Sequence, residues 1–129
     1  MPTTPPDPRS FLPLTPLAFQ VLLALADDDR HGYGIILEVR ERTDGLISLG
    51  TGTLYTMLQR LLEESLIGEA QRPARRPEDD QRRKYYALTA LGREVIAAEA
   101  RRLQGVLAEA QRKNVLAGPP PRRSRAGRT

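Results

Sequence analysis

The sequence contains no cysteine and only one histidine, His31, among its 129 residues. Without cysteine the chain can form no disulfide, no thiolate zinc site and no cysteine nucleophile. One histidine is too few for a histidine-based metal cage or a conventional catalytic triad. The sequence also lacks a glycine-rich phosphate loop and a pair of carboxylates on an otherwise apolar face. It therefore predicts a protein that is not an enzyme and that uses no metal or other cofactor.

Long hydrophobic runs are missing as well. No run approaches the roughly 18 apolar residues that a membrane-spanning helix needs. Five prolines between Pro2 and Pro13 interrupt the stretch in which the apolar segment of a signal peptide would lie. We therefore expect a soluble, cytoplasmic protein.

The positive charge of the chain lies in its C-terminal tail. The formal net charge is +4, and the four arginines of residues 118–129 account for all of it. A basic chain usually indicates a nucleic acid or an acidic membrane as partner, but residues 1–117 carry no net charge. The relevant question is whether positive side chains cluster within the folded part.

The two ends of the sequence resemble linkers. Residues 1–14 are rich in proline and show no hydrophobic periodicity, so they predict a flexible N-terminal arm. Residues 118–129 contain three consecutive prolines and scattered arginines, which predicts a disordered basic tail. About a hundred residues between these ends must supply the core, enough for one domain and an accessory helix.

Three helices are predicted in the first half of that core. Thr15 followed by Pro16 is typical of a helix start, and the helix after it is apolar nearly all round. A second helix is expected over residues 34–43. A third, capped by Thr51 or Thr53, has apolar residues at i, i+3, i+4, i+7 and i+8, starting from Leu54, which form one face.

Two short strands and a long helix follow. Residues 66–72 and 84–88 read as strands flanking a polar loop, and Thr89 caps a helix that continues to about Leu116. The predicted fold is mainly α with a small β-ribbon, a winged helix-turn-helix plus a long C-terminal helix. Residues 15–88 would form the DNA-binding domain and residues 89–117 the dimerisation helix.

The last helix has a heptad-like seam. A helix of about 28 residues is roughly 42 Å long, which is too long for a domain of this size to cover. The uncovered part of its apolar stripe is therefore predicted to pack against a second copy of the chain. The alternative is a surface helix with an incidental stripe. The predicted dimer-interface residues are Ile96, Ala100, Leu103, Leu107, Ala110 and Asn114.

Three short motifs in this order resemble the PadR family of bacterial transcription regulators, over residues 15–112. They are HGYGI at 31–35, GTLY at 52–55 and KYYALT at 84–89, followed by Gly92. The single C-terminal helix resembles the compact subgroup of that family. The resemblance implies a homodimeric, nucleoid-associated repressor that binds a palindromic operator and releases it when a small molecule binds. One departure is Thr56, where the family commonly has proline.

The polar side of the third helix is the predicted DNA-contacting face. Hydroxyl, amide and guanidinium groups suit phosphates and base edges, since Gln pairs with adenine and Arg with guanine. Tyr33, at the start of the second helix, either contacts phosphate or packs against the first helix. The alternative for the third helix is an ordinary solvated face. The candidates on these helices are Tyr33, Thr51, Thr53, Tyr55, Thr56, Gln59 and Arg60.

The loop between the strands is the predicted wing. Its arginines can bind phosphate through two parallel hydrogen bonds, whereas the acids at residues 78–80 would lie at the tip. The alternative is a flexible loop that neutralises its own charge. The candidates in the wing are Arg75, Arg76, Arg82, Arg83 and Lys84.

Two tyrosines and the histidine have structural explanations. Tyr85 and Tyr86 are adjacent on a strand and must face opposite ways, so we expect Tyr86 in the core and Tyr85 more exposed. We expect His31 to cap or pack rather than to bind a ligand. A different function remains open from the sequence: a helical protein–protein interaction module with a winged-helix fold that binds no specific DNA.

Overall fold

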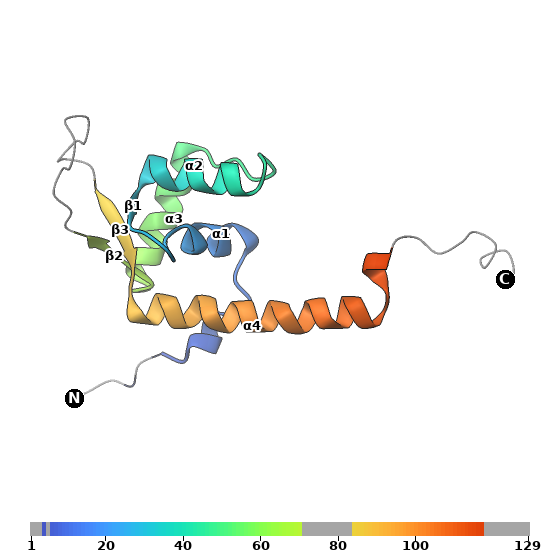
Figure 1. Ribbon diagram of the computed structural model, residues 1–129. Helices are drawn as coiled ribbons and strands as arrows, with labels where there is room; N and C mark the ends of the chain where they lie inside the picture. Colours follow the sequence, from blue (N-terminus) through green and yellow to red (C-terminus); the bar gives the residue numbers. More distant parts are fainter. Residues whose placement is uncertain (1–3, 5, 71–83, 118–129) are drawn as a thin grey trace, which may run out of the picture. The chain divides into compact units, whose positions relative to one another are not determined.

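The computed structural model describes residues 4, 6–70 and 84–117 (Figure 1). The chain divides into two compact units between Glu99 and Ala100. Three helices followed by a small antiparallel sheet and a further helix confirm the predicted fold class. The elements are the 3₁₀ helix η1 (Pro8–Phe11), α1 (Pro16–Ala24), β1 (Arg30–His31), α2 (Gly32–Arg42), α3 (Thr51–Glu63), β2 (Ile67–Ala70), β3 (Tyr85–Leu88), α4 (Ala90–Arg112) and the 3₁₀ helix η2 (Val115–Ala117).

Side-chain caps fix the starts of α1 and α2. The Thr15 hydroxyl accepts a hydrogen bond from the Ala18 amide at 3.1 Å, as predicted. Nδ1 of His31 accepts from the Gly34 amide at 3.1 Å, so α2 begins at Gly32, two residues earlier than expected. This confirms the structural explanation of His31. Arg30 ends α1 from outside, since its Nε donates to the Ala24 carbonyl at 2.6 Å.

The ends of α3 differ from the prediction in one respect. Neither Thr51 nor Thr53 caps it: Gly50 occupies the cap position and Thr51 is the first helical residue. At the other end Ser65 has a left-handed backbone (φ 63°), and the Leu66 amide donates to the Leu61 carbonyl at 3.0 Å. This six-residue closure turns the chain from α3 into the sheet.

The sheet has three strands where the sequence predicts two. Their order is β1-β3-β2, with both pairings antiparallel. Strand β2 is described over Ile67–Ala70, and residues 71 and 72 of the predicted strand lie outside the described residues. The additional strand β1 pairs Arg30 with Tyr86 and His31 with Tyr85. Two residues are too few to show an alternating pattern, so this strand is defined by its partner.

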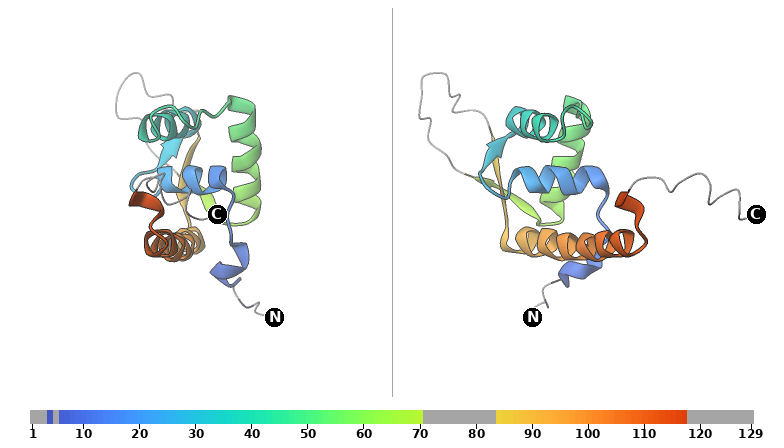
Figure 2. Two further views of the ribbon diagram at one scale, coloured as in Figure 1. Left: turned by 90° about the vertical axis from the view of Figure 1, so that its right-hand side faces the viewer. Right: turned by 45° about the vertical axis from the view of Figure 1, so that its right-hand side comes forward.

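The core lies between the first three helices, the sheet and the first part of α4. In both views of Figure 2, α3 runs past α1 and α2, and α2 packs against each of the other two helices. Tyr86 is 4% exposed and belongs to this core, as predicted. The apolar residues that are buried most completely are Val21, Leu22, Ala24, Ile35, Val39, Leu54, Leu66 and Val95.

Part of the N-terminal arm is structured. Residues 8–11 form η1, which begins where Oδ1 of Asp7 accepts a hydrogen bond from the Arg9 amide at 3.0 Å. Phe11, Leu12 and Leu14 pack against the core. The prediction of a flexible arm is therefore wrong for residues 8–14, because removing three large apolar side chains from water stabilises their ordered position.

Helix α4 starts as predicted and ends earlier. The Thr89 hydroxyl accepts from the Gly92 amide at 2.9 Å, which confirms the cap. The helix stops at Arg112, not near Leu116, because Asn114 has φ 65° and breaks the helical run. Asparagine tolerates this conformation better than most residues.

Candidate nucleic-acid interface

One side of α3 is buried and the opposite side is exposed. Leu54, Leu58 and Leu61 are at most 3% exposed and hold the helix on the core. The other side offers hydroxyl, amide and guanidinium groups to solvent, as the sequence predicts. The exposed residues on it are Thr51, Thr53, Tyr55, Thr56, Gln59 and Arg60.

The ring of Tyr55 also contacts the start of α2. A Cβ placed on Gly32 would lie 2.3 Å from the Tyr55 hydroxyl oxygen and 2.7 Å from its Cζ. While the Tyr55 ring keeps this position only glycine fits beneath it, which explains the small residue that the sequence places before Tyr33. Tyr55 is still 47% exposed. It can therefore hold α2 and α3 in place and contact a ligand with the rest of its ring.

The start of α2 brings a second tyrosine to the surface. Tyr33 is 59% exposed, which contradicts the alternative in which it packs against α1. The N-terminal end of a helix favours anions through its free amides, although at α2 the His31 ring occupies the Gly34 amide. Tyr33 thus lies next to a helix start, where it can reach a phosphate.

Acidic residues accompany the polar side chains near the end of α3. The Nε atom of Arg60 lies 3.7 Å from Oε2 of Glu64, and Nε2 of Gln59 donates to Glu63 at 3.3 Å. Arg60 is 76% exposed, so solvent screens this ion pair and it stabilises the fold little. The first three turns of α3 carry no acid. A negatively charged partner would therefore be favoured toward the N-terminal part of the helix.

The sheet borders the C-terminal half of α3. Burial raises the pKa of the Tyr86 hydroxyl above its usual value, and the acidic groups of Tyr55 and Glu69 raise it further. Tyr86 is therefore uncharged at neutral pH. Tyr85, half-buried on the opposite face, meets the His31 ring edge-on with 5.3 Å between ring centroids.

Most of the predicted wing lies outside the described residues. Arg75, Arg76, Arg82 and Arg83 belong to the range 71–83, and their role stays a prediction. Lys84 is described: it precedes β3, is exposed, and its ammonium lies 3.6 Å from Oε2 of Glu69. This ion pair leaves most of the lysine surface open to a phosphate.

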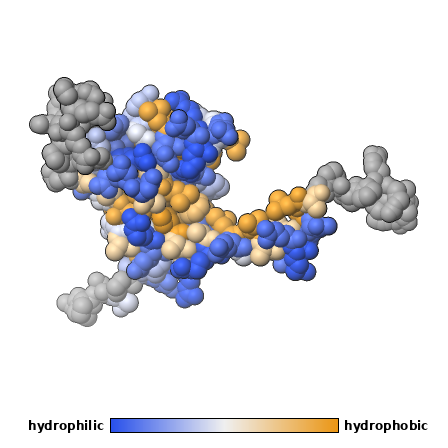
Figure 3. All heavy atoms as spheres, in the orientation of Figure 1, coloured by the Kyte–Doolittle hydropathy of each residue, from blue (hydrophilic) through white to orange (hydrophobic). Residues whose placement is uncertain are grey.

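The structure places the two end residues of the predicted dimer seam, Ile96 and Asn114, in different surroundings from the residues between them. Ile96 is 8% exposed and belongs to the core of its own unit, and Asn114 lies beyond the end of α4. The residues between them stay a prediction. Figure 3 shows hydrophobic atoms along one side of the C-terminal part of α4 and hydrophilic atoms along the other. The large apolar residues exposed here are Leu103, Val106, Leu107, Val115 and Leu116, three of which the seam did not include.

Sequence reasoning missed a cavity beside α3. It has a volume of about 850 Å³, is partly open to solvent and is lined by residues of η1, the start of α1 and α3. Thr53, Thr56 and Arg60, three of the predicted DNA contacts, line it. The apolar residues at positions 11, 12 and 14 were the available signal, because a solvated arm seldom carries three large apolar side chains.

The described ranges contain neither a cluster of metal-binding side chains nor a membrane-spanning helix. No group of three or more His, Cys, Asp or Glu side chains in residues 4, 6–70 and 84–117 could hold a metal ion. In the same part of the chain, no helix is long and apolar enough to cross a membrane.

Comparisons with known proteins show similarity to transcription regulators. The family profile described as the transcriptional regulator PadR-like family matches residues 21–98. An uncharacterized protein ("X") of Lysinibacillus sphaericus is 32% identical over 77 residues, 57% of this chain and 64% of that protein. The match thus spans less than two thirds of that relative.

Solved structures have the same fold. A crystal structure of a PadR family transcription regulator from Clostridium difficile R20291 has a TM-score of 0.64 and 26% identity, covering 79% of this chain and 98% of that one. Bacillus subtilis PadR in complex with operator DNA has a TM-score of 0.54 and 22% identity, covering 64% of this chain and 45% of that one. The second likeness concerns the fold alone.

Proposed function

Because this chain belongs to the PadR-like family of transcriptional regulators, we propose that it is a homodimeric repressor that binds a palindromic DNA operator. In this proposal, residues 15–88 bind DNA and residues 89–117 pair two copies. A small-molecule effector releases the operator. The protein acts in the cytoplasm, at the nucleoid, and catalyses no reaction.

The exposed polar side of α3 is the observation that carries this proposal. Its Thr, Gln and Arg side chains combine groups for base edges with groups for phosphates. The leucines on the opposite, buried side of α3 pack against the core, so the exposed polar side chains are not needed for that packing. The second helix of a helix-turn-helix pair lies in the major groove, with its early residues against the bases. Thr53, Thr56 and Gln59 are therefore assigned to base edges and Arg60 to a base or a phosphate.

Neighbouring elements would hold the DNA backbone. Tyr33 at the start of α2 is assigned to a phosphate, and Lys84 to a second phosphate beside the wing. The arginines predicted in the wing, Arg75, Arg76, Arg82 and Arg83, would extend this contact along the backbone. Contacts of this kind position a protein on DNA without selecting the sequence.

Exposed apolar side chains in residues 100–117 support pairing of two copies. Leu103, Val106 and Leu107 are 37%, 54% and 47% exposed on α4, and Val115 and Leu116 are more than 60% exposed. Several large apolar side chains exposed within one short segment are typical of an interface. Pairing would present two α3 helices to half-sites about 34 Å apart, one helical turn of DNA.

Selection of bound sequences from a random DNA pool tests the proposal. The full chain should enrich an inverted repeat. Gln59→Ala should lower affinity and relax the preference at one base pair of each half-site, because a side-chain contact to a base is worth about 1–3 kcal/mol. Arg101→Gln, an exposed change on α4 away from the apolar stripe, is the matched control and should leave the preference unchanged.

A salt series separates this function from the protein-interaction alternative. A DNA-binding chain should show a negative slope of log affinity against log salt concentration, with about one unit lost for each phosphate contact removed. Arg60→Gln and Lys84→Gln should each reduce the slope. A flat response with the unmodified chain would favour an interaction module without DNA binding.

A further inference from the structure

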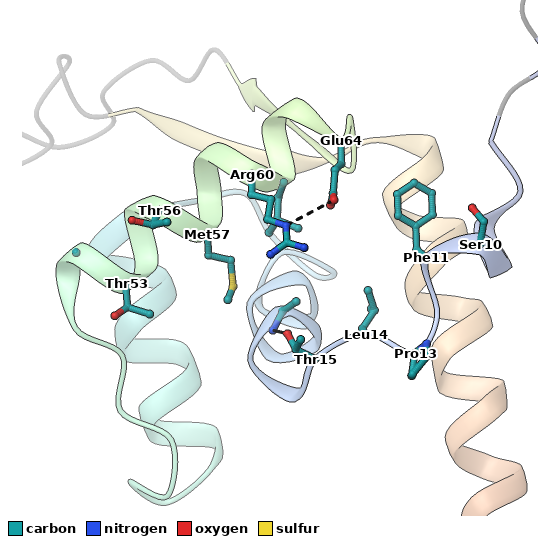
Figure 4. Close-up of a pocket in the computed structure, with 13 residues that line it drawn as sticks. Ser10, Phe11, Pro13, Leu14, Thr15, Thr53, Thr56, Met57, Arg60 and Glu64 are labelled. Carbon is teal, nitrogen blue, oxygen red and sulfur yellow. Dashed lines mark hydrogen bonds and ion pairs between the residues drawn. The ribbon is translucent and has the colours of Figure 1, made fainter.

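The cavity beside α3 has an apolar wall. Figure 4 shows Phe11, Leu14 and Met57 directed toward it from the N-terminal segment and from α3, and Ala18 and Leu61 complete the wall. Its volume of about 850 Å³ lies within the range of small-molecule sites, about 300–1,000 Å³. All these residues belong to the same compact unit.

One end of this cavity is charged. Arg60 and Glu64 both line it, with 3.7 Å between Nε and Oε2, a distance too long for a hydrogen bond. Among the described residues no hydrogen bond occupies the guanidinium. A guanidinium has five N–H donors in a planar fork and can hold two carboxylates at once. A ligand carboxylate can therefore bind Arg60 without displacing Glu64.

We propose that this cavity binds a small amphipathic carboxylate. Its hydrocarbon body lies against the apolar wall formed by Phe11, Leu14 and Met57. Its carboxylate accepts hydrogen bonds from the Arg60 guanidinium. The hydroxyls of Thr15 and Thr56, which also line the cavity, provide further donors near its edge.

Binding in this cavity would compete with DNA. Thr53, Thr56 and Arg60 line the cavity and are also assigned to DNA, so a bound carboxylate occupies groups that the operator needs. This consequence rests on the proposed function, whereas binding of the carboxylate itself does not. It would make the cavity the site at which an effector releases the operator.

Three eight-carbon probes test the ligand class on the full chain. Octanoate, 1-octanol and octylammonium are titrated into ¹⁵N-labelled protein, and shifts of the backbone amides are followed by NMR. We expect octanoate to bind more tightly than the other two, with shifts confined to residues 10–18 and 52–64. Arg60→Gln should weaken octanoate binding about two- to fivefold, because the guanidinium is largely exposed. Arg101→Gln should change nothing.

A second variant fills the cavity. Ala18→Phe should abolish the octanoate shifts; a thermal melt followed by circular dichroism shows whether it folds. If it does not, Arg60→Gln decides alone, because that side chain is exposed and supports no core contact. Equal or tighter binding of octanol or octylammonium would overturn the carboxylate assignment. The carboxylate assignment would also be overturned if the amide shifts depended on protein concentration and not on octanoate concentration, since a second copy of the chain would then cover the cavity.

Measuring DNA binding together with octanoate binding distinguishes failure of the cavity proposal from failure of the proposed function. Octanoate binding by a chain that binds no DNA would leave the cavity assignment intact and refute the proposed function. Operator binding by a chain that does not bind octanoate would leave the proposed function intact and refute the cavity assignment. If both bind, octanoate should lower operator affinity in the unmodified chain and leave it unchanged in Ala18→Phe.

Discussion

Replacing Gly92 with alanine would place a methyl group against the backbone of the turn between α3 and β2. A Cβ on Gly92 would lie 2.0 Å from the Leu66 carbonyl oxygen and 3.0 Å from its carbon. Cβ atoms do not approach another heavy atom closer than about 3.0 Å, so the two segments would have to separate by at least about 1 Å. The neighbour is backbone, and no side-chain rotation can relieve the clash.

Two hydrogen bonds resist this separation. The Thr89 amide donates to the Leu66 carbonyl at 3.1 Å, and the Thr89 hydroxyl donates to the Ser65 carbonyl at 2.6 Å. Their loss would cost about 1 kcal/mol each, and overpacking costs about 1–3 kcal/mol. Alanine regains roughly 0.5–1 kcal/mol of helix propensity. The free energy of unfolding should therefore fall by about 2–4 kcal/mol.

Thermal and urea denaturation followed by circular dichroism measure this change. For a domain of this size the expected loss corresponds to a decrease in Tm of about 10 °C or more. Gly105→Ala is the matched control, because Gly105 lies in the same helix and no described atom lies within 4 Å of its Cβ position. That variant should gain up to about 1 kcal/mol. Equal stability of the two variants would refute the close approach of α4 to Leu66.

Three further changes probe other parts of the molecule. Ser65→Gly should raise the free energy of unfolding by about 1 kcal/mol in urea denaturation, because Ser65 has φ 63° and glycine adopts this conformation without strain. Gly32→Ala should displace the Tyr55 ring, a movable side chain. DNA affinity measured by fluorescence anisotropy should therefore fall, whereas Tm should change little. Leu107→Glu should give monomers in light scattering at micromolar concentration, because it puts a charge into the apolar stripe.

For each of these three substitutions, one outcome would contradict the prediction. Lower stability of Ser65→Gly would show that the left-handed turn after α3 is not as described. A large loss of Tm in Gly32→Ala with unchanged DNA affinity would mean that Tyr55 supports the fold only. A dimeric Leu107→Glu variant would place the interface elsewhere, and Arg101→Gln, which keeps the stripe, controls for the change of charge on α4.

The helices were predictable because their signals are local. A hydroxyl residue just before an apolar periodic segment favours a helix start, and the caps at Thr15 and Thr89 are confirmed, whereas the cap expected at Thr51 or Thr53 is not. The apolar spacing of α3 likewise determines which side is buried, so exposure of Thr53, Thr56 and Gln59 follows from the same pattern.

Short segments and ends were less predictable. Strand β1 has two residues and owes its existence to β3. The 3₁₀ helix η1 lies in a proline-rich stretch, and its order depends on the burial of Phe11 and its neighbours. Helix α4 ends four residues early, because the backbone reverses at Asn114 inside a pattern that otherwise continues.

The sequence by itself determined the order of the four α-helices and of strands β2 and β3, the polar side of α3 and the family to which the chain is similar. Periodicity, caps and short motifs act over a few residues, and they can be recognised without knowing what lies beside them. Tertiary structure alone decided that Tyr55 lies over Gly32, that Ile96 faces its own core, and that the N-terminal segment borders a cavity that Arg60 also lines. Each of these depends on contacts between residues far apart in the chain, for which no local pattern exists.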